Sequence, residues 1–394
     1  RSRRTATGGA RTGRSRSSRR AARVAVRDTI RFATTRGILR ARRCRHVPTD
    51  GLEPISPTEA VELHLEAMKD DSAEWTRRSH ESHLRAFVEW CREDGGVDDM
   101  TELGGRDLFR FRVWRREGGY SKGQDDEIAP KTLDSALSVI RSFLRSCAAF
   151  DAVPEDLYLK VPLLDLSEGE RVSDTTMVPE RVPPILEYLD RYKYASRVHV
   201  LYLLMWHTGA RLSGMRSLDL EDVEADKADP CIRFRHRPES DTPLKNDEKS
   251  ERVNRISDRV AQIVSDYIEG PRLDQLDEHN RAPLFTTKHG RISRGAIRNA
   301  FYSWTRPCAI GEGCPHDKDP ETCEWTYYEH ASKCPSSRSP HNIRKARVTK
   351  YRNDGVQRGV VSDRLDASAN VLDEHYDRAS EREKAARRWR EIQR

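Results

Sequence analysis

The chain has 394 residues, of which 36% are hydrophobic and 34% are Asp, Glu, Lys or Arg. That length has room for two or three domains with cores of their own, and the longest apolar stretch, residues 198–206, is too short to span a bilayer. We therefore expect a soluble, cytoplasmic protein and exclude a membrane protein.

The net charge of +7 is concentrated at the start of the chain. Residues 1–50 hold sixteen Arg, no Lys and two acids, which is +14 and leaves −7 for the rest. Because they show little hydrophobic periodicity, residues 1–52 are predicted to be a disordered basic arm. Three interpretations of the arm stay open: an organellar transit peptide, an arm that wraps DNA, and upstream sequence without a folded role.

The rest of the chain is acidic and poor in lysine. This composition suits a high-salt cytoplasm, where screening shortens the range of charge repulsion, and it is equally typical of a GC-rich genome that favours Arg codons. An acidic body argues against a general nucleic-acid coat. Any contact with DNA therefore has to come from local basic patches.

Residues 53–153 carry four stretches with the apolar periodicity of helices. The first begins at Ser56, where Pro57 and Glu59 are typical of a helix N-terminus, and the others cover residues 74–92, 103–116 and 130–150. We predict a small all-helical domain whose exposed Arg and Lys either bind phosphates or form an ordinary solvated face. Residues 154–180 contain several prolines and little periodicity, which indicates a linker.

Residues 181–394 are predicted to form a second domain that mixes helices with short strands. Helices are expected at residues 182–192, 197–209, 257–270, 293–306 and 381–393. Short strands are expected at residues 231–234, 241–244 and 252–256, the last two joined by a turn at 246–248. The fold class is therefore mainly α with a small β-sheet (α+β). The charged helix at 381–393 is expected either to dock on a neighbouring protomer or to fold back on its own domain.

Four of the eight cysteines lie in a Gly- and Pro-containing insertion at residues 307–335: Cys308, Cys314, Cys323 and Cys334. Four thiolates in a loop without its own core can close a tetrahedral zinc site, and His316 could replace one of them. Reduced, unliganded cysteines are one alternative, and disulfides are another that a reducing compartment disfavours. We predict a structural zinc ion here.

Five side chains in the second domain have the chemistry needed for phosphoryl transfer. In Ser339-Pro340-His341-Asn342-Ile343-Arg344, a capping serine and a first-turn proline place an imidazole and a guanidinium on one helix face. Arg211 follows a glycine at the end of an apolar helix, where a half-buried guanidinium is normally either paired or bound to a ligand. Lys245 supplies an ammonium group, with Lys249 as the alternative, and Tyr376 supplies a phenol.

In this order the residues resemble the sequence boxes of the tyrosine recombinase (phage integrase) family. The composition and the cysteine loop look most like those of integrases from salt-loving archaea. Thr208-Gly209-Ala210-Arg211-Leu212-Ser213 is similar to the first arginine box, and Pro340-His341-Asn342-Ile343-Arg344 to the His-x-x-Arg box. Asp373-Glu374-His375-Tyr376 is similar to the nucleophile segment, and Lys245 to the hairpin lysine. The resemblance covers residues 56–394. It implies a core-binding domain at 53–153 and a catalytic domain of the DNA breaking-rejoining type at 181–394.

The resemblance implies a site-specific recombinase or integrase that cleaves and rejoins double-stranded DNA through a 3′-phosphotyrosine, as a homotetramer on DNA. Tyr376 would attack the phosphate, while Arg211 and Arg344 hold its non-bridging oxygens. Lys245 would protonate the leaving 5′-oxygen, and His341 would handle the tyrosine proton. The resemblance implies no cofactor and no metal in the chemistry, so a zinc ion at residues 307–335 would be structural.

Two positions depart from the family pattern. Gly214 stands where the family usually has Glu or Asp, and Ala367 stands where it usually has His or Trp. Alanine cannot donate a hydrogen bond to a phosphate oxygen, so an alternative function is that of a catalytically weak or inactive DNA-binding regulator. A zinc-stabilised interaction module with chance matches is a third interpretation, which predicts no salt-dependent DNA binding.

Overall fold

The computed structural model describes residues 51–72, 74–120, 127–167, 170, 175–368, 372 and 380–393. The chain divides into two compact units: the first holds the residues up to Phe111 and Val139–Val161, and the second holds Arg112–Ser138 and the residues from Pro162 onward. Within the described part of the chain, no helix has both the length and the hydrophobicity needed to cross a membrane.

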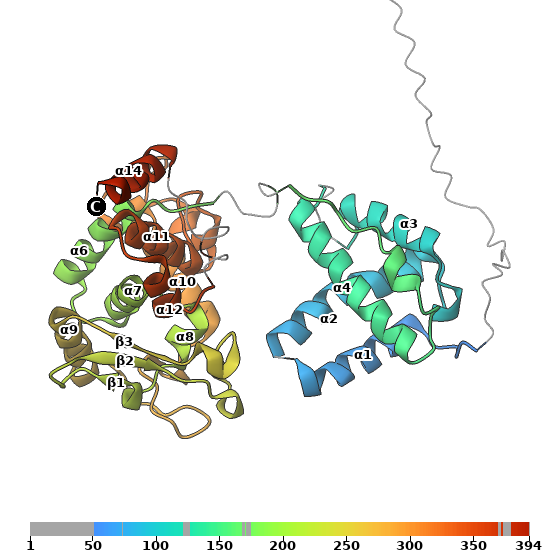
Figure 1. Ribbon diagram of the computed structural model, residues 1–394, viewed down its shortest axis with the longest axis horizontal. Coiled ribbons are helices and arrows are strands. Elements are labelled where there is room, and N and C mark those ends of the chain that lie inside the picture. The colour runs from blue at the N-terminus through green and yellow to red at the C-terminus, as the bar shows by residue number, and fades with distance from the viewer. Residues whose placement is uncertain are drawn as a thin grey trace, which may run out of the picture. The chain divides into compact units, whose positions relative to one another are not determined.

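The first part of the chain forms four helices in the predicted order (Figure 1): α1 (Pro57–Asp71), α2 (Glu74–Trp90), α3 (Gly105–Arg116) and α4 (Pro130–Ala149). The predicted start of α1 is confirmed, because Ser56 and Glu59 form a capping box. The Glu59 backbone N–H donates to Ser56 Oγ at 3.2 Å, and the Ser56 backbone N–H donates to the Glu59 carboxylate at 3.2 Å. These bonds satisfy two donors that a helix start otherwise leaves unpaired.

An aromatic cluster forms the core of the first unit. The Phe87 ring of α2 lies 5.4 Å from Phe111 of α3 and 5.9 Å from Phe143 of α4, measured between ring centroids. Trp90 packs on Phe111 at 5.6 Å. All four side chains are buried, so the helical periodicity of the sequence marks the true core faces.

The second unit is built around α7 (Arg197–Thr208), which contacts α6, α9, α10 and α11. The other helices of this unit are α6 (Val182–Tyr192), α8 (Leu212–Ser217), α9 (Asp258–Glu269), α10 (Arg294–Trp304), α11 (Pro340–Asn353), α12 (Arg358–Leu365) and α14 (Glu381–Ile392). The inner face of α7 is fully buried, and Figure 1 shows the neighbouring helices around it. The long apolar stretch of the sequence is therefore a core helix.

A three-stranded antiparallel sheet covers one end of these helices. Its strands are β1 (Val223–Glu224), β2 (Cys231–Phe234) and β3 (Arg252–Arg255), in that spatial order. Ile232 and Phe234 of β2 belong to the same buried cluster as the helices, so the sheet shares their core. A separate two-stranded hairpin joins β4 (Thr286–Thr287) to β5 (Gly290–Arg291). The unit is mainly helical with a small antiparallel sheet, which confirms the predicted fold class.

The predicted strand at residues 241–244 is wrong. Asp241 has a φ of 52°, a left-handed conformation that interrupts an extended strand. The neighbouring hydroxyls accept hydrogen bonds from a guanidinium: Arg281 donates to Ser240 Oγ at 2.6 Å and to Thr242 Oγ1 at 2.8 Å. Strand β3 pairs instead with β2, with Phe234 opposite Arg252. The residues between these two strands form a long loop that carries Lys245.

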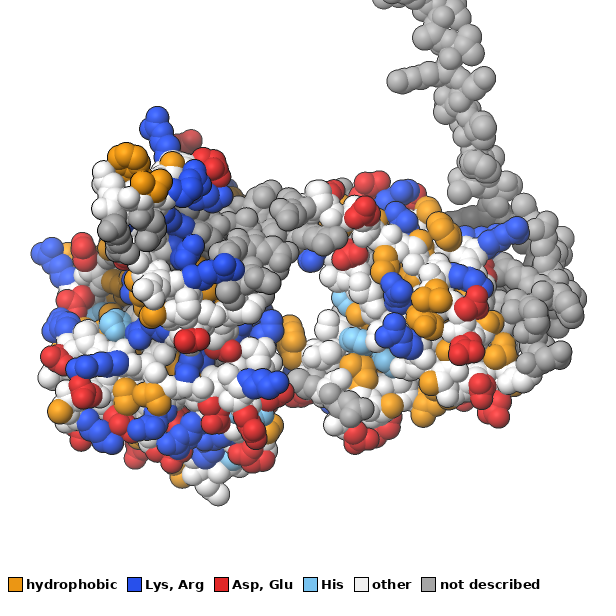
Figure 2. Space-filling model, viewed as in Figure 1, with side chains coloured by type: hydrophobic (Ala, Val, Ile, Leu, Met, Phe, Trp, Pro, Cys, Tyr) orange, Lys and Arg blue, Asp and Glu red, His pale blue; other side chains and the backbone are white. Residues whose placement is uncertain are grey.

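Arginine–carboxylate pairs hold the sheet end of this unit together. Figure 2 shows acidic and basic side chains interspersed over it. Asp219 is only 3% exposed and accepts hydrogen bonds from Arg281 Nε at 2.7 Å and Arg291 Nη2 at 2.5 Å. A carboxylate buried this deeply is stable because it is paired with cations.

The tail helix α14 packs on α11 of the same chain. Arg387 Nε donates to the Asn353 side-chain oxygen at 2.7 Å, and the Asn353 amide donates to Glu383. The apolar residues Trp389 and Ile392 stay 60% and 75% exposed. The helix therefore contacts its own unit through polar side chains and leaves its apolar residues exposed, and docking of that face on a neighbouring protomer stays a prediction.

Candidate active site

The turn between α7 and α8 places Arg211. Gly209 ends α7 with a φ of 64°, and Arg211 is the extended residue that immediately precedes α8. A Cβ at Gly209 would lie 2.9 Å from Leu365 Cδ2, so both the conformation and the space require glycine. The Arg211 side chain is 17% exposed and pairs with the carboxylate of Asp366. The expected pairing of a half-buried arginine is therefore present.

Helix α11 begins at the predicted residue and places His341 and Arg344. Ser339 is the N-cap and Pro340 occupies the first turn. The Asn342 side-chain oxygen accepts from the Ser339 backbone N–H at 3.2 Å and from the Ser339 hydroxyl at 2.6 Å. The capped start fixes the first turn, which carries the imidazole.

Arg344 joins the two segments that hold Arg211. It is 1% exposed, and its Nη1 donates to the Gly209 carbonyl at 2.6 Å and to the Leu365 carbonyl at 2.7 Å. Gly209 lies two residues before Arg211, and Leu365 lies one residue before its partner Asp366. The two predicted arginines, 133 positions apart in the sequence, therefore meet at one place in the second unit.

The imidazole of His341 lies at the open side of this place. His341 is an exposed residue, but protein atoms surround much of its side chain, and its pKa is lowered to about 4. Desolvation is the largest cause, and the positive charges of Lys345, Arg344, Arg211 and Lys245 contribute the rest. The ring is neutral at pH 7 and can accept a proton.

Lys245 is an exposed residue two positions before a short 3₁₀ turn, Asp247–Ser250. Its charge is among those that lower the pKa of His341. Lys245 stays the predicted ammonium group of this site, with Lys249 as the alternative.

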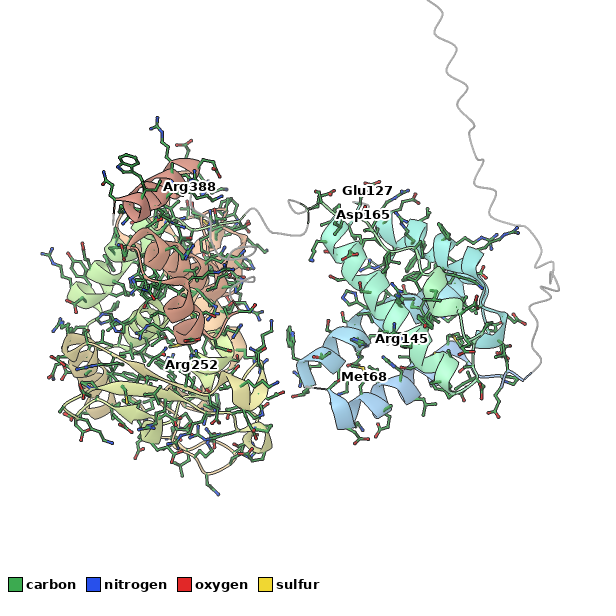
Figure 3. The ribbon with its side chains drawn as sticks, viewed as in Figure 1. Met68, Glu127, Arg145, Asp165, Arg252 and Arg388 are labelled. Atoms are coloured by element: carbon green, nitrogen blue, oxygen red, sulfur yellow. The ribbon has the colours of Figure 1, made fainter. Side chains whose placement is uncertain are left out.

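Three further residues contact this site and were not predicted from the sequence: Ser250, Arg252 and Asp366. Asp366 accepts from Ser250 Oγ at 2.6 Å as well as from Arg211. Arg252, labelled in Figure 3, belongs to β3. Its guanidinium lies over the Phe234 ring, 4.2 Å from the ring centroid, and donates to the Ser250 carbonyl at 2.8 Å. Burial lowers the pKa of Arg252 to about 10, so it remains a cation at neutral pH. An acid directly before Ala367 was the one sequence signal that could have indicated Asp366.

The two departures from the family pattern have local packing reasons. A Cβ at Gly214 would lie 3.2 Å from Cδ1 of Phe234, so a larger residue there would have to displace a buried ring. Ala367 is 6% exposed and belongs to a small apolar cluster with Val348, Val361 and Leu365. Its methyl group packs in that cluster and offers no polar atom to a phosphate.

The remaining predicted site residue is outside the described part of the chain. Tyr376 falls among residues 373–379, which the structure does not describe. Residues 1–50, most of the predicted arm at 1–52, are also outside the described part. The nucleophile assignment stays a prediction.

The structure does not support the predicted zinc site. Within the described residues, which include Cys308, Cys314, Cys323 and Cys334, no group of three or more His, Cys, Asp or Glu side chains is placed to hold a metal ion. The four cysteines are free thiols. Other contacts hold the loop: His316 Nε2 lies 2.9 Å from Ser336 Oγ, and Lys318 lies 4.5 Å from the centroid of the Trp325 ring.

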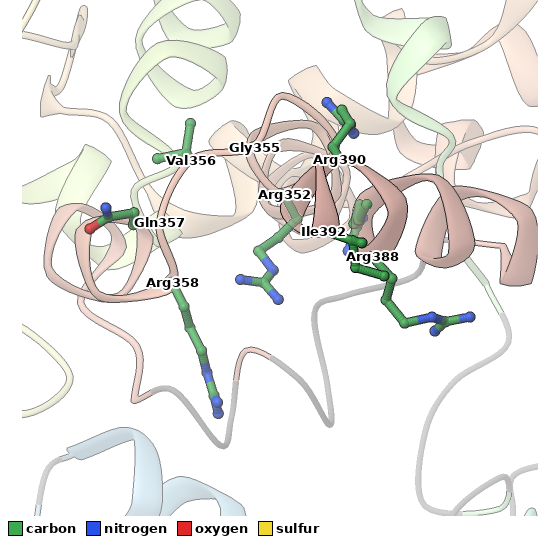
Figure 4. Close-up of a pocket in the computed structure, with 9 residues that line it drawn as sticks. Arg352, Gly355, Val356, Gln357, Arg358, Arg388, Arg390 and Ile392 are labelled. Carbon is green, nitrogen blue, oxygen red and sulfur yellow. The ribbon is translucent and has the colours of Figure 1, made fainter. Parts of the chain in front are cut away.

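A cavity of 610 Å³ lies at the tail helix, away from the arginine pair. Arginines from α11, α12 and α14 line it, and Figure 4 shows Arg352, Arg358, Arg388 and Arg390 around it. Its lining is basic, which suits an anion, but it contains none of the five predicted catalytic residues.

Solved structures of integrases have the same fold. The Tn1549 transposon integrase in complex with a circular intermediate DNA has a TM-score of 0.59 at 13% sequence identity, covering 85% of this chain and 99% of that one. A lambda integrase dimer bound to a COC′ core site has a TM-score of 0.55 at 11% identity, covering 86% and 83%. The chain therefore has the tyrosine recombinase fold.

A third structure is the N-terminal domain of a phage integrase/site-specific recombinase from Haloarcula marismortui. It is 31% identical over 28% of this chain and 99% of that one, and its TM-score is 0.25. No family model matches the sequence. No curated protein matches it either.

Proposed function

We propose that the chain is a site-specific DNA recombinase or integrase of the tyrosine recombinase family. Tyr376 Oη attacks the scissile phosphorus, the P–O5′ bond breaks, and a 3′-phosphotyrosine and a free 5′-hydroxyl result. His341 takes the phenol proton, and Lys245 gives a proton to the leaving 5′-oxygen. Arg211 and Arg344 hold the non-bridging oxygens as charge develops. No metal ion or cofactor takes part in these steps.

The observation that carries the proposal is the bonding of Arg344 to the carbonyls of Gly209 and Leu365. It brings the two arginine boxes together around His341, whose pKa responds to Arg211, Arg344 and Lys245. A phosphodiester carries one negative charge, so a cluster of cations beside a neutral imidazole suits it electrostatically.

The proposal assigns a role to each part of the chain. Residues 53–153 act as a core-binding domain, residues 154–180 as a linker and residues 181–394 as the catalytic domain. The partner is double-stranded DNA, on which four copies of the chain assemble. We also propose a relationship to integrases of salt-loving archaea, which the acidic, lysine-poor composition after residue 50 supports.

A trapping assay tests the proposal. Nicked duplexes tiled over the DNA that flanks the chain's own gene are incubated with the protein, and covalent adducts are separated on denaturing gels. Wild type should form an adduct, and a chelator should leave its yield unchanged. Tyr376→Phe should form none while it still binds DNA. Tyr327→Phe is the matched control, because Tyr327 is 63% exposed on the second unit and its loss should leave the yield unchanged.

The second candidate function is a DNA-binding regulator with little or no catalysis. Gly214 and Ala367 favour it, since neither offers a polar side chain to the phosphate. It predicts salt-dependent DNA binding without an adduct from wild type. An adduct that persists in Tyr376→Phe would instead contradict the nucleophile assignment.

A further inference from the structure

Asp366 is a mostly buried carboxylate that contacts separate parts of the candidate site. It ends α12 with a φ of 54° and a ψ of 61°, and its side chain is 13% exposed. One oxygen, Oδ2, accepts from Arg211 Nη1 and from Ser250 Oγ, the latter at 2.6 Å. The other, Oδ1, accepts from Asn246 Nδ2 at 3.1 Å. A single side chain thus connects α12, the start of α8 and the loop before β3.

Two of these hydrogen bonds go to the loop that carries Lys245. Asn246 is the residue after Lys245, and Ser250 ends the 3₁₀ turn that follows. The Asn246 backbone N–H also donates to Ser250 Oγ at 3.1 Å, so the two anchored residues are joined to each other. On the other side of Lys245, the Leu244 backbone N–H donates to His236 Nδ1 at 3.0 Å. The lysine therefore lies between two fixed residues.

We propose that Asp366 is a positioning residue: by holding Asn246 and Ser250 beside Arg211, it places the ammonium of Lys245 at the leaving oxygen. This inference rests on the proposed function, in which Lys245 is the acid. When the P–O5′ bond breaks, its electron pair goes to O5′, and a proton moves from Lys245 Nζ to that oxygen. An exposed, flexible lysine transfers a proton efficiently only if its backbone is held within reach.

The variant Asp366→Asn separates the chemistry of the carboxylate from its shape. A carboxylate only accepts, whereas an amide has one oxygen and one NH₂ donor. Because both oxygens of Asp366 face donors, the amide must turn its NH₂ toward either Asn246 or the Arg211–Ser250 side. Asparagine tolerates the left-handed backbone of this position, so the fold should survive the change. Asp363→Asn is the matched control, since Asp363 is exposed on the same helix.

The test compares two leaving groups. Each variant is given the nicked duplex with an ordinary phosphodiester and the same duplex with sulfur in place of the bridging 5′-oxygen. A thiol with a pKa near 8.5 leaves as a thiolate without protonation, so sulfur removes the need for the acid. Asp366→Asn should slow adduct formation about ten- to a hundredfold on the oxygen substrate, as expected for a misplaced general acid. On the sulfur substrate it should match wild type, as Lys245→Ala should.

The outcomes are distinct. Equal losses on both substrates, with wild type active, would overturn the positioning role and leave the proposed function intact. Absence of an adduct from wild type on either substrate would instead overturn the proposed function. Amide hydrogen exchange supplies a readout independent of activity: Asp366→Asn should speed exchange at residues 246–250, and Asp363→Asn should not. Unchanged exchange in that loop would overturn the proposal.

Discussion

The turn at Gly209 should be the most sensitive point of the second unit, and Gly209→Ala tests it. The substitution places an alanine at a φ of 64°, which costs about 1–2 kcal/mol for a non-glycine residue. The new Cβ would also lie 2.9 Å from both Cδ2 and Cγ of Leu365, which is 0% exposed and has no free space to move into. Overpacking of this kind costs about 1–3 kcal/mol. We expect a total destabilisation of about 2–5 kcal/mol.

Gly311→Ala is the matched control for backbone strain. Gly311 has a φ of 81°, and no atom lies within 4 Å of the Cβ that alanine would add. Its substitution should therefore cost only the conformational part, about 1–2 kcal/mol. Differential scanning calorimetry of the full chain should show a lower unfolding midpoint for Gly209→Ala, by about 4–8 °C beyond the shift of Gly311→Ala. Equal shifts in the two variants would refute the steric argument.

A double variant isolates the contact itself. Leu365→Ala removes the atoms that the new Cβ would meet, so Gly209→Ala should cost less in that background than in wild type. The sum of the destabilisations of the two single variants should exceed the destabilisation of the double variant by about 1–3 kcal/mol, because the two residues share one contact. Strict additivity would show that Leu365 is not the obstacle. The carbonyls of both residues accept from Arg344, so the same variants should also slow adduct formation.

Three more predictions follow from buried polar groups. Burial lowers the pKa of His64 to about 4 from an ordinary 6.5. Between these two values the unfolded chain binds more protons than the folded chain, so the free energy of unfolding falls as the pH falls, by up to about 3 kcal/mol. A thermal midpoint that is flat from pH 7 to pH 4.5 would contradict this. Asp219→Ala should cost about 3–5 kcal/mol in urea unfolding, because it removes the buried carboxylate that pairs with Arg281 and leaves Arg291 with Asp277 alone. Asp274→Ala, at a side chain 95% exposed, should cost under about 1 kcal/mol. Asn353→Ala should expose residues 381–392 to limited proteolysis with little change in midpoint, and equal protection in wild type and variant would exclude Asn353 as the anchor of α14.

Local sequence signals predicted most of the helical fold. The capping serines, first-turn prolines and apolar periodicities lie in the chain itself, so α1, α7 and α11 begin where their caps stand. The strand predicted at 241–244 failed in a segment whose neighbours Ser240 and Thr242 bond to Arg281, some forty residues further along the chain. Strands make their hydrogen bonds with other segments of the chain, and no local pattern specifies those partners.

The site also contains both kinds of residue, those whose placement local signals indicate and those whose placement depends on distant contacts. Arg211, His341 and Arg344 stand in segments with their own caps and turns, so the residues around them indicate where they face. Asp366 and Arg252 gain their roles only from contacts between β3, α8 and α12, which no short motif encodes. The zinc prediction rested on the spacing of cysteines along the chain, and a metal site also requires the fold to bring its ligands into one coordination geometry, which no local pattern specifies.

The charge of the site explains why Asp366 matters beyond geometry. Arg211, Arg344, Lys245 and Lys345 all act on His341, and uncompensated cations at such short range repel each other. The carboxylate of Asp366 offsets part of that repulsion in the free protein, at the guanidinium that the proposed mechanism assigns to the phosphate. A bound phosphodiester would bring a second negative charge to the same guanidinium. The arginine must then share its donors between the two anions or release one of them. The mechanism that we propose requires Asp366 to keep its bonds to Asn246 and Ser250 in either case, so that the lysine loop stays anchored when Arg211 binds the phosphate.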